Sequence, residues 1–165
     1  MDMDITVRNA TEADLDAVSA VEGECFPAAE AADRETFAER LRVYPEHFYL
    51  AFPGERLVAF VDGSVTDEKD LTDEMYENVS LHDEKGRWQM VFGVNTVPEY
   101  RRRGIAGELI KRVISDAREQ GRDGVVLTCK ERLIHYYEKF GFKSEGVTDK
   151  STHGNVEWYQ MRHRF

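Results

Sequence analysis

Apolar residues along the chain follow two spacings, one typical of strands and one typical of helices, and the two alternate along the sequence. Short apolar runs predict strands at "DITVRNA" (4–10), "HFYLAF" (47–52), "RLVAFVDGSV" (56–65), "WQMVFGVNTV" (88–97) and "DGVVLTC" (123–129), with two closing strands around "HGN" (153–155). Helical spacing predicts helices over 15–25, 34–44, 102–120 and 132–140. The polar, acidic stretch 65–87 predicts a loop that contains a short helix.

Mixed strands and helices in this order predict an α/β or α+β fold with helices on both faces of a sheet. The chain has 165 residues, and it shows neither an internal repeat nor a linker, so we expect one domain over residues 1–165.

The sequence also marks the boundaries of two helices. Thr11 with Asp14 three residues later predicts a helix start, and Gly121 predicts the end of helix 102–120. That helix has an apolar stripe of Ile105, Leu109, Ile110, Val113, Ile114 and Ala117.

Composition and charge limit the classes of function. With 41% apolar and 33% charged residues, the chain resembles an ordinary soluble globular protein. Its net charge of -10 argues against a general nucleic-acid binder and favours a cationic substrate. No apolar run approaches membrane length, the acidic N-terminus is unlike a signal peptide, and Cys25 and Cys129 lack metal-ligand spacing. We therefore expect a cytoplasmic protein with no bound metal and no membrane partner.

Three consecutive arginines, Arg101 to Arg103, stand at the start of the predicted helix 102–120. Cations are disfavoured at that end of a helix unless an anion is bound there, because the helix dipole is positive at its N-terminus. Gly104 and Gly107 would let another group approach the backbone closely. Free amides, glycines and arginines together predict an anion site, with phosphate as the expected anion. A solvated charge cluster, neutralised by Glu99 and Glu108, is the alternative explanation.

Two ordered motifs in this part of the chain resemble the GCN5-related N-acetyltransferase (GNAT) superfamily. "RRRGIA" (101–106) is similar to its Q/R-x-x-G-x-G/A motif, and "YYEKFGF" (136–142) is similar to its Y-x-x-x-G-F motif. Most of the chain from Tyr44 onward further resembles the serotonin (arylalkylamine) N-acetyltransferase branch. The resemblance implies a GNAT-type domain with a central mixed, mostly antiparallel twisted sheet, and acetyl-CoA as co-substrate. It also implies that the diphosphate of coenzyme A is the anion at the arginines.

The resemblance assigns roles to particular positions. Backbone amides on the strand before the arginines would polarise the acetyl carbonyl, and the cofactor-binding positions would be Val94, Asn95, Thr96, Arg101, Arg102, Arg103, Gly104, Ile105, Ala106 and Gly107. Gly93 and Asn95 are poor strand formers and predict an irregularity there, for which a fraying strand end is the simpler explanation. Tyr137 would protonate the departing thiolate. The helical pattern alone does not choose between Tyr136 and Tyr137, and either could be a core aromatic.

Two further predictions concern the base and the amine site. Met90 and Phe92 stand where the arylalkylamine branch has two histidines, so no histidine is proposed as the base. Asp62 shares a strand face with Val58 and Phe60, where a carboxylate could attract an ammonium group, but an edge or exposed aspartate is the expected explanation. Phe26, Pro27 and Trp158 resemble amine-binding positions, although core packing accounts for Phe26 and Trp158 nearly as well.

The sequence thus predicts acetyl transfer to a primary amine, in particular a small aryl- or alkylamine, by direct attack in a ternary complex. A protein or peptide N-acetyltransferase, or a non-catalytic acyl-CoA sensor, are the alternatives. We expect a small-molecule amine as partner, no nucleic acid, and a monomer or homodimer.

Overall fold

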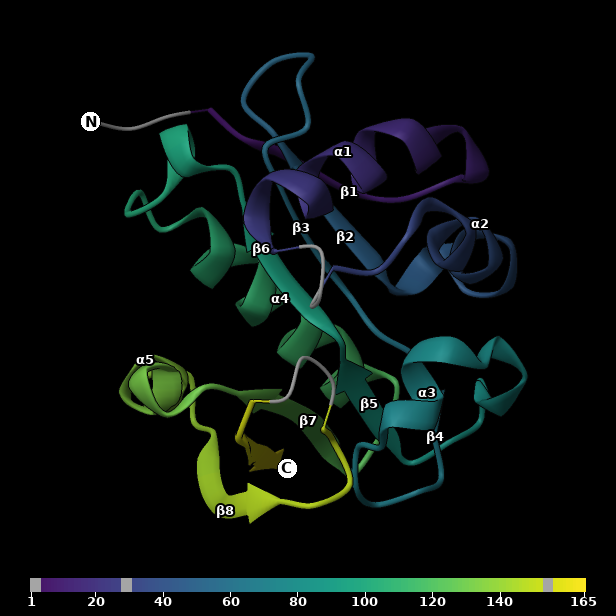
Figure 1. The fold of residues 1–165 in the computed structure, drawn as a ribbon, viewed down its shortest axis with the longest axis vertical. Helices are drawn as coiled ribbons and strands as arrows, with labels where there is room; N and C mark the ends of the chain where they lie inside the picture. The colour runs from purple at the N-terminus through teal and green to yellow at the C-terminus, as the bar shows by residue number, and fades with distance from the viewer. Residues whose placement is uncertain (1–3, 28–30, 153–155) are drawn as a thin grey trace. The chain divides into compact units, whose positions relative to one another are not determined.

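The computed structural model describes residues 4–27, 31–152 and 156–165, and it divides the chain into two compact units. The first unit comprises Met1–Asp62 and Gly93–Arg112, and the second unit comprises Gly63–Phe92 and Val113–Phe165. Each unit has a β-sheet of its own (Figure 1). Because each unit is made of two separate segments, the chain crosses from one unit to the other several times.

The sheet of the first unit has four antiparallel strands in the order β1-β2-β3-β6. Their bounds are Thr6–Asn9 for β1, Phe48–Phe52 for β2, Ala59–Asp62 for β3 and Gly93–Thr96 for β6. Pro53 and Gly54 lie between β2 and β3, as the hairpin signal in the sequence indicates. Because β6 is the last strand in this order, one of its backbone edges is not paired within the sheet.

Two helices complete the first unit, α1 (Leu15–Cys25) and α2 (Arg34–Val43). The predicted start at Thr11 is confirmed, because Thr11 and Asp14 form a capping box around the short 3₁₀ turn before α1. The core is aromatic: Phe37 of α2 packs edge-on against Phe60 of β3, and Phe48 of β2 stacks on Phe60. All three rings are fully buried.

The sheet of the second unit has the strand order β4-β5-β7-β9-β8. The bounds are Val65–Thr66 for β4, Trp88–Val91 for β5, Gly124–Cys129 for β7, Lys143–Thr148 for β8 and Trp158–Arg164 for β9. The β5–β7 pair is parallel and the other pairs are antiparallel. Helices α3 (Asp73–Glu77) and α5 (Ile134–Glu138) belong to this unit, and α4 (Ile105–Glu119) crosses the division between the units.

The predicted fold class is confirmed, with mixed and mostly antiparallel strands and flanking helices. Two predicted strands are each divided: 88–97 becomes β5 and β6, and 56–65 becomes β3 and β4, with the parts in different sheets. The closing strands are β8 and β9, whereas "HGN" lies outside the described residues. Among the described helices, none is long and apolar enough to cross a membrane.

Candidate active site

The turn between β6 and α4 combines two unusual backbone conformations. Arg102 has a φ of 63° and Gly104 a φ of 80°, both in the left-handed region that side chains other than glycine rarely adopt. Alternating positive φ values turn successive amide groups toward one side of the chain, which makes a concave site for an anion. The turn leads directly into the N-terminus of α4, and the first amides of a helix have no acceptor within the helix. Backbone geometry therefore supplies anion donors at the position of the predicted diphosphate site.

The three arginines differ in their contacts, although all are exposed. Arg101 Nε donates to the Thr96 carbonyl at 2.9 Å, so this side chain fastens the turn to the end of β6. The Arg103 guanidinium lies 4.9 Å from the centre of the Tyr100 ring, in a cation–π contact. The structure thus brings the arginines together with positive charge facing solvent. Glu99 forms its ion pair with Arg56 and not with one of these three arginines.

Helix α4 begins at Ile105, not at residue 102 as the apolar stripe predicts, so Arg102 and Gly104 precede the helix. The difference follows from their positive φ values, which a right-handed helix excludes. Ile105, Ala106 and Gly107 form the first helical residues. The predicted apolar stripe is buried along its whole length, and Gly121, with a φ of 79°, ends the helix as expected.

The free edge of β6 presents two amides. Val97 N, directly after β6, donates at 2.9 Å to the carbonyl of Val58, the residue before β3. By alternation the Asn95 amide also faces β3, while the Val94 and Thr96 amides face away. Two donors from outside the sheet reach the Thr96 carbonyl, Arg101 Nε at 2.9 Å and Cys25 Sγ at 3.4 Å, which agrees with this direction. Val94 and Thr96, and not Asn95, are therefore the candidate donors to an acetyl carbonyl.

The Asn95 side chain instead binds a buried carboxylate on α1. Glu22 Oε1 accepts from Asn95 Nδ2 at 2.9 Å, and Glu22 Oε2 accepts from the Ala32 amide at 2.8 Å. Burial raises the pKa of Glu22 to about 7, and the Ala32 hydrogen bond opposes this shift only in part. Glu22 was not predicted from the sequence to be a functional residue. Its position one turn after Val18, in the apolar stripe of α1, was the available signal.

The expectation that Asp62 lies on an edge or an exposed face is wrong. Asp62 is buried at the end of β3, and its Oδ2 lies 3.0 Å from Arg40 Nη1 of α2. Burial raises the pKa of Asp62, and the Arg40 guanidinium acts against that shift. Gly93, opposite Asp62 in the register, leaves space for this group, since a Cβ there would lie 3.3 Å from Asp62 Oδ1 and from Asn95 Nδ2. The Asp62 carboxylate is therefore already paired with a cationic side chain, the guanidinium of Arg40.

Tyr137 lies in the second unit, on α5, and is buried. Its ring contacts Tyr136 and Phe142 edge-on, with ring centres 5.1 Å and 6.1 Å away. Burial, with smaller contributions from Cys129 and Tyr136, raises the pKa of the Tyr137 hydroxyl well above its usual range. The hydroxyl is therefore protonated at neutral pH. Tyr136 is half-buried, so the two tyrosines occupy different surroundings, as their helical spacing predicts.

The predicted amine-binding residues are divided between the units. Phe26 is half-buried and Pro27 exposed in the first unit, directly after α1. Residues 28–30 of the predicted substrate loop lie outside the described residues. Trp158 is buried at the start of β9 in the second unit, opposite Thr148. The burial of Trp158 is compatible with core packing as well as with a role in binding.

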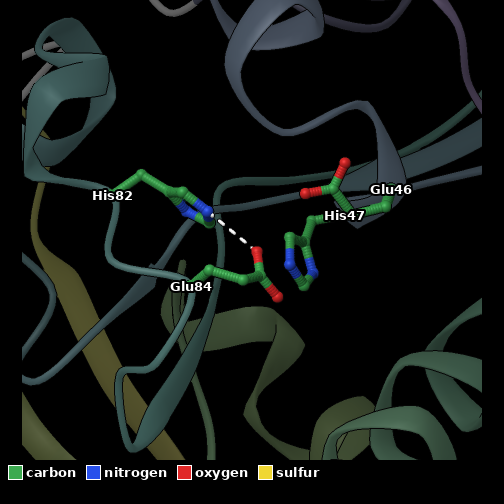
Figure 2. A group of neighbouring side chains, drawn as sticks. All are labelled: Glu46, His47, His82 and Glu84. Carbon is green, nitrogen blue, oxygen red and sulfur yellow. Dashed lines mark hydrogen bonds and ion pairs between the residues drawn. The ribbon is translucent and has the colours of Figure 1, made fainter.

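Three of the described histidines, His82, His135 and His163, make hydrogen bonds to neighbouring groups. His82 Nδ1 accepts from the Val65 amide at 3.0 Å, and His82 Nε2 lies 3.0 Å from Glu84 Oε1 (Figure 2). Because Nδ1 accepts, Nε2 carries the proton and donates to Glu84. His163 Nδ1 lies 2.9 Å from the Phe140 carbonyl, and His135 pairs with Glu138 on the surface. These contacts agree with proposing no histidine as the base.

The site residues can be compared with known proteins. The family model described as "Acetyltransferase (GNAT) family" matches residues 15–142, which include both the arginine turn and Tyr137. The chain belongs to this acetyltransferase family. The GNAT resemblance of the two sequence motifs is thereby confirmed, and the family match extends across both units.

Individual proteins of known function or structure are also similar to this chain. The serotonin N-acetyltransferase of Mesocricetus auratus is 33% identical over 107 residues, which are 64% of this chain and 50% of that protein. The match thus spans about half the length of that curated relative. The loading GNATL domain of CurA from Lyngbya majuscula has a TM-score of 0.83 at 17% identity, covering 98% of each chain. The GphF GNAT-like decarboxylase, in complex with isobutyryl-CoA, has a TM-score of 0.82 at 19% identity, covering 96% of this chain and 98% of that one. At these identities the two structures show a shared fold.

Proposed function

We propose that this GNAT protein transfers an acetyl group from acetyl-CoA to a primary amine, by direct attack of the amine within a ternary complex. The observation that carries the proposal is the turn before α4, where Arg102 and Gly104 have positive φ values next to a helix N-terminus and exposed arginines. Such a turn suits a diphosphate, because it offers several amides and positive charge at one place. The serotonin N-acetyltransferase relative and the family match support the transferred group and the acceptor class.

The residues of the turn would hold the diphosphate of coenzyme A. The amides from Arg102 to Gly107 would donate to its oxygens, and the arginine side chains would add charge. Bound acetyl-CoA would supply an acetyl group activated as a thioester. The Val94 and Thr96 amides, which face away from β3, would donate to the acetyl oxygen as negative charge develops on it.

Tyr137 would give its hydroxyl proton to the departing thiolate. The Y-x-x-x-G-F motif is the basis for this role, and burial supports it by keeping the hydroxyl protonated. Tyr136 is the alternative donor from the same helix. Burial raises the pKa of Tyr136 as well, so the two tyrosines must be separated by mutation.

The acceptor would be a small aryl- or alkylamine. The serotonin N-acetyltransferase relative suggests this class, and Phe26, Pro27 and Trp158 are apolar residues suited to line such a site. A net charge of -10 would favour the approach of a cationic amine. The replacement of the histidine pair by Met90 and Phe92 leaves the exact amine open. It also keeps two other candidates under test, a protein or peptide N-acetyltransferase and an acyl-CoA sensor.

A thiol-release screen separates these candidates. Purified protein is incubated with acetyl-CoA and, in turn, with aryl amines, alkyl amines, polyamines and peptides, and free thiol is measured. Release with an aryl- or alkylamine, together with the mass of the N-acetyl product, is the expected result. Release with peptides alone would select the protein-modifying alternative. Coenzyme A binding by calorimetry without thiol release from any amine would select the sensor.

A further inference from the structure

The buried carboxylate of Glu22, in the first unit, accepts hydrogen bonds from two uncharged donors in the described part of the chain. Glu22 is 7% exposed, and its two oxygens accept hydrogen bonds from the Asn95 side-chain amide and the Ala32 backbone amide. Both donors are uncharged, and no lysine, arginine or histidine forms an ion pair with Glu22 within the described residues. An ionised carboxylate buried in this way gains most from a ligand that brings a proton or a positive charge.

Asn95 provides a second, independent indication of a ligand. It is 1% exposed, and its Oδ1 is buried without a hydrogen-bond donor in the part of the chain that the structure describes. A buried carbonyl oxygen left unpaired costs stability, so such oxygens are usually satisfied by protein, water or ligand. A primary ammonium group has three N–H donors. It could therefore satisfy both the Glu22 carboxylate and Asn95 Oδ1.

The same pair lies beside the candidate acetyl site of this unit. Asn95 stands between Val94 and Thr96 on β6, and those two residues have the amides that face away from β3. Glu22 is hydrogen-bonded to the residue between them. The carboxylate is thus fixed to the strand at which the acetyl carbonyl would be polarised.

Other charged and titratable groups of the first unit also affect Glu22. Arg40 of α2 and Asp62 of β3 act on it in opposite directions and are paired with each other. Cys25 follows one turn later on α1, and its thiol is influenced by both Glu22 and Arg101. Burial remains the largest cause, and it brings the pKa of Glu22 to about 7. A carboxylate with this pKa is ionised in a substantial fraction of molecules at neutral pH and is basic enough to hold a proton.

We propose that Glu22 is the base that accepts a proton from the amine substrate, with Asn95 positioning its carboxylate. The proposal rests on the acetyl transfer proposed above. An ammonium group loses one proton to Glu22, which later releases it to water. The free nitrogen lone pair then forms the bond to the acetyl carbon, and the C–S bond breaks with its electron pair on sulfur. The nitrogen loses a second proton to water, and Tyr137, if it protonates the thiolate as proposed above, regains its proton from water.

Asn95 can serve both protonation states of Glu22. Its Nδ2 donates to the ionised carboxylate in the structure. After rotation of the side-chain amide, Oδ1 can accept from the protonated carboxyl group. The same rotation makes Gln a suitable replacement for Glu22, because the new amide can donate to Asn95 Oδ1 while its oxygen accepts from the Ala32 amide.

The test compares Glu22→Gln with wild-type protein and with Glu24→Gln, a control on the exposed side of the same helix. Thiol release is measured from pH 5.5 to 9.5 with one good primary amine, and coenzyme A affinity is measured by calorimetry. We expect wild-type kcat/KM to rise with pH and level off near pH 7. Glu22→Gln should lose on the order of 100-fold to 10,000-fold in kcat/KM and show no inflection near pH 7, with coenzyme A affinity unchanged. Glu24→Gln should follow the wild-type profile.

Three outcomes would overturn parts of the proposal separately. A Glu22→Gln profile of wild-type shape, whatever its height, would show that Glu22 is structural and not a base. Failure of wild-type protein to turn over any amine would overturn the proposed acetyl transfer instead. If Glu22→Gln does not fold, a measurement on ligand-free wild-type protein still tests the proposal. Carbon-13 NMR of the glutamate carboxyl groups should show one resonance that titrates near pH 7. If none titrates between pH 6 and 8, Glu22 cannot be the base proposed here.

Discussion

Arg40 Nη1 lies 3.0 Å from Asp62 Oδ2, and the two side chains are only 3% and 1% exposed. A buried ion pair adds little net stability compared with apolar residues, but removal of one member leaves a buried charge without compensation. The pair fills part of the interior between α2 and β3, close to Gly93 and Asn95. Its main consequence for the site is that Arg40 is engaged by Asp62, while Glu22 keeps only uncharged donors.

Removal of the Asp62 charge should destabilise the protein strongly. Asp62→Asn leaves the Arg40 guanidinium buried beside a neutral amide, and the expected loss is about 3–5 kcal/mol in the free energy of unfolding. Urea denaturation measures this change. Glu99→Gln is the control, because the Arg56–Glu99 pair is exposed and its loss should leave the urea midpoint unchanged. Equal midpoints for Asp62→Asn and wild type would contradict an ionised pair in the interior.

Gly104 should be required for coenzyme A binding. Its φ of 80° strains any other residue, and a side chain would project into the open space beside the turn. Coenzyme A at about 100 times its dissociation constant should stabilise wild-type protein by roughly 2.7 kcal/mol, and Gly104→Val should lose this shift. Thermal unfolding with and without the ligand measures it. Gly146→Val is the matched control, since Gly146 has a φ of 90° and open space but lies on β8. A ligand shift in Gly104→Val equal to that of the control would refute the diphosphate site.

Glu22 should make the protein less stable as pH rises from about 4.5 to 7. Its carboxyl group has a higher pKa in the folded state, about 7, than its ordinary value of 4.5. Between these two pH values the folded protein binds more protons than the unfolded chain, so stability falls with increasing pH. The full effect corresponds to about 3 kcal/mol. Glu22→Gln should therefore be more stable than wild type at pH 8 and similar at pH 4.5, as measured by urea unfolding at both values. A constant difference between the two proteins across this range would show that the Glu22 pKa is not raised.

The sequence predicted most elements because their signals are local. The capping box at Thr11, the apolar stripe of α4 and the stop at Gly121 all depend on residues within a few positions of each other. The division of 88–97 into β5 and β6 was not predictable in the same way. Apolar side chains fit a strand on either side of Phe92, but the change of sheet depends on which distant strands supply hydrogen bonds, β7 for β5 and β3 for β6.

The same distinction between local and long-range signals applies to the candidate site. Motif spacing was enough to predict a role for the arginine turn and for Tyr137, because those residues are close in sequence to the glycines of the two motifs. Glu22 and Asn95 are separated by 73 positions, so only the folded chain shows that they are hydrogen-bonded. Asp62 was misjudged for the same reason, since its partner Arg40 comes from a different element.

Tyr137 should matter to turnover much more than to coenzyme A binding. Tyr137→Phe keeps the ring and its edge-on contacts with Tyr136 and Phe142, and it removes only the hydroxyl proton. The loss of a general acid typically lowers kcat by on the order of 100-fold to 10,000-fold. The measurement is kcat of both proteins with one good amine, with coenzyme A affinity determined by calorimetry.

Tyr136→Phe is the internal control, because Tyr136 is half-buried and faces about 100° away from Tyr137 on α5. It should retain most of the wild-type kcat. A collapse of kcat in Tyr136→Phe with near-normal turnover in Tyr137→Phe would show that Tyr136 is the donor. If both variants remain active, the thiolate takes its proton from water or leaves without one, because no hydroxyl on α5 is then needed for its departure. An equal loss of coenzyme A affinity and kcat in Tyr137→Phe would instead indicate a packing role for this ring, since the hydroxyl alone should act after the cofactor is bound.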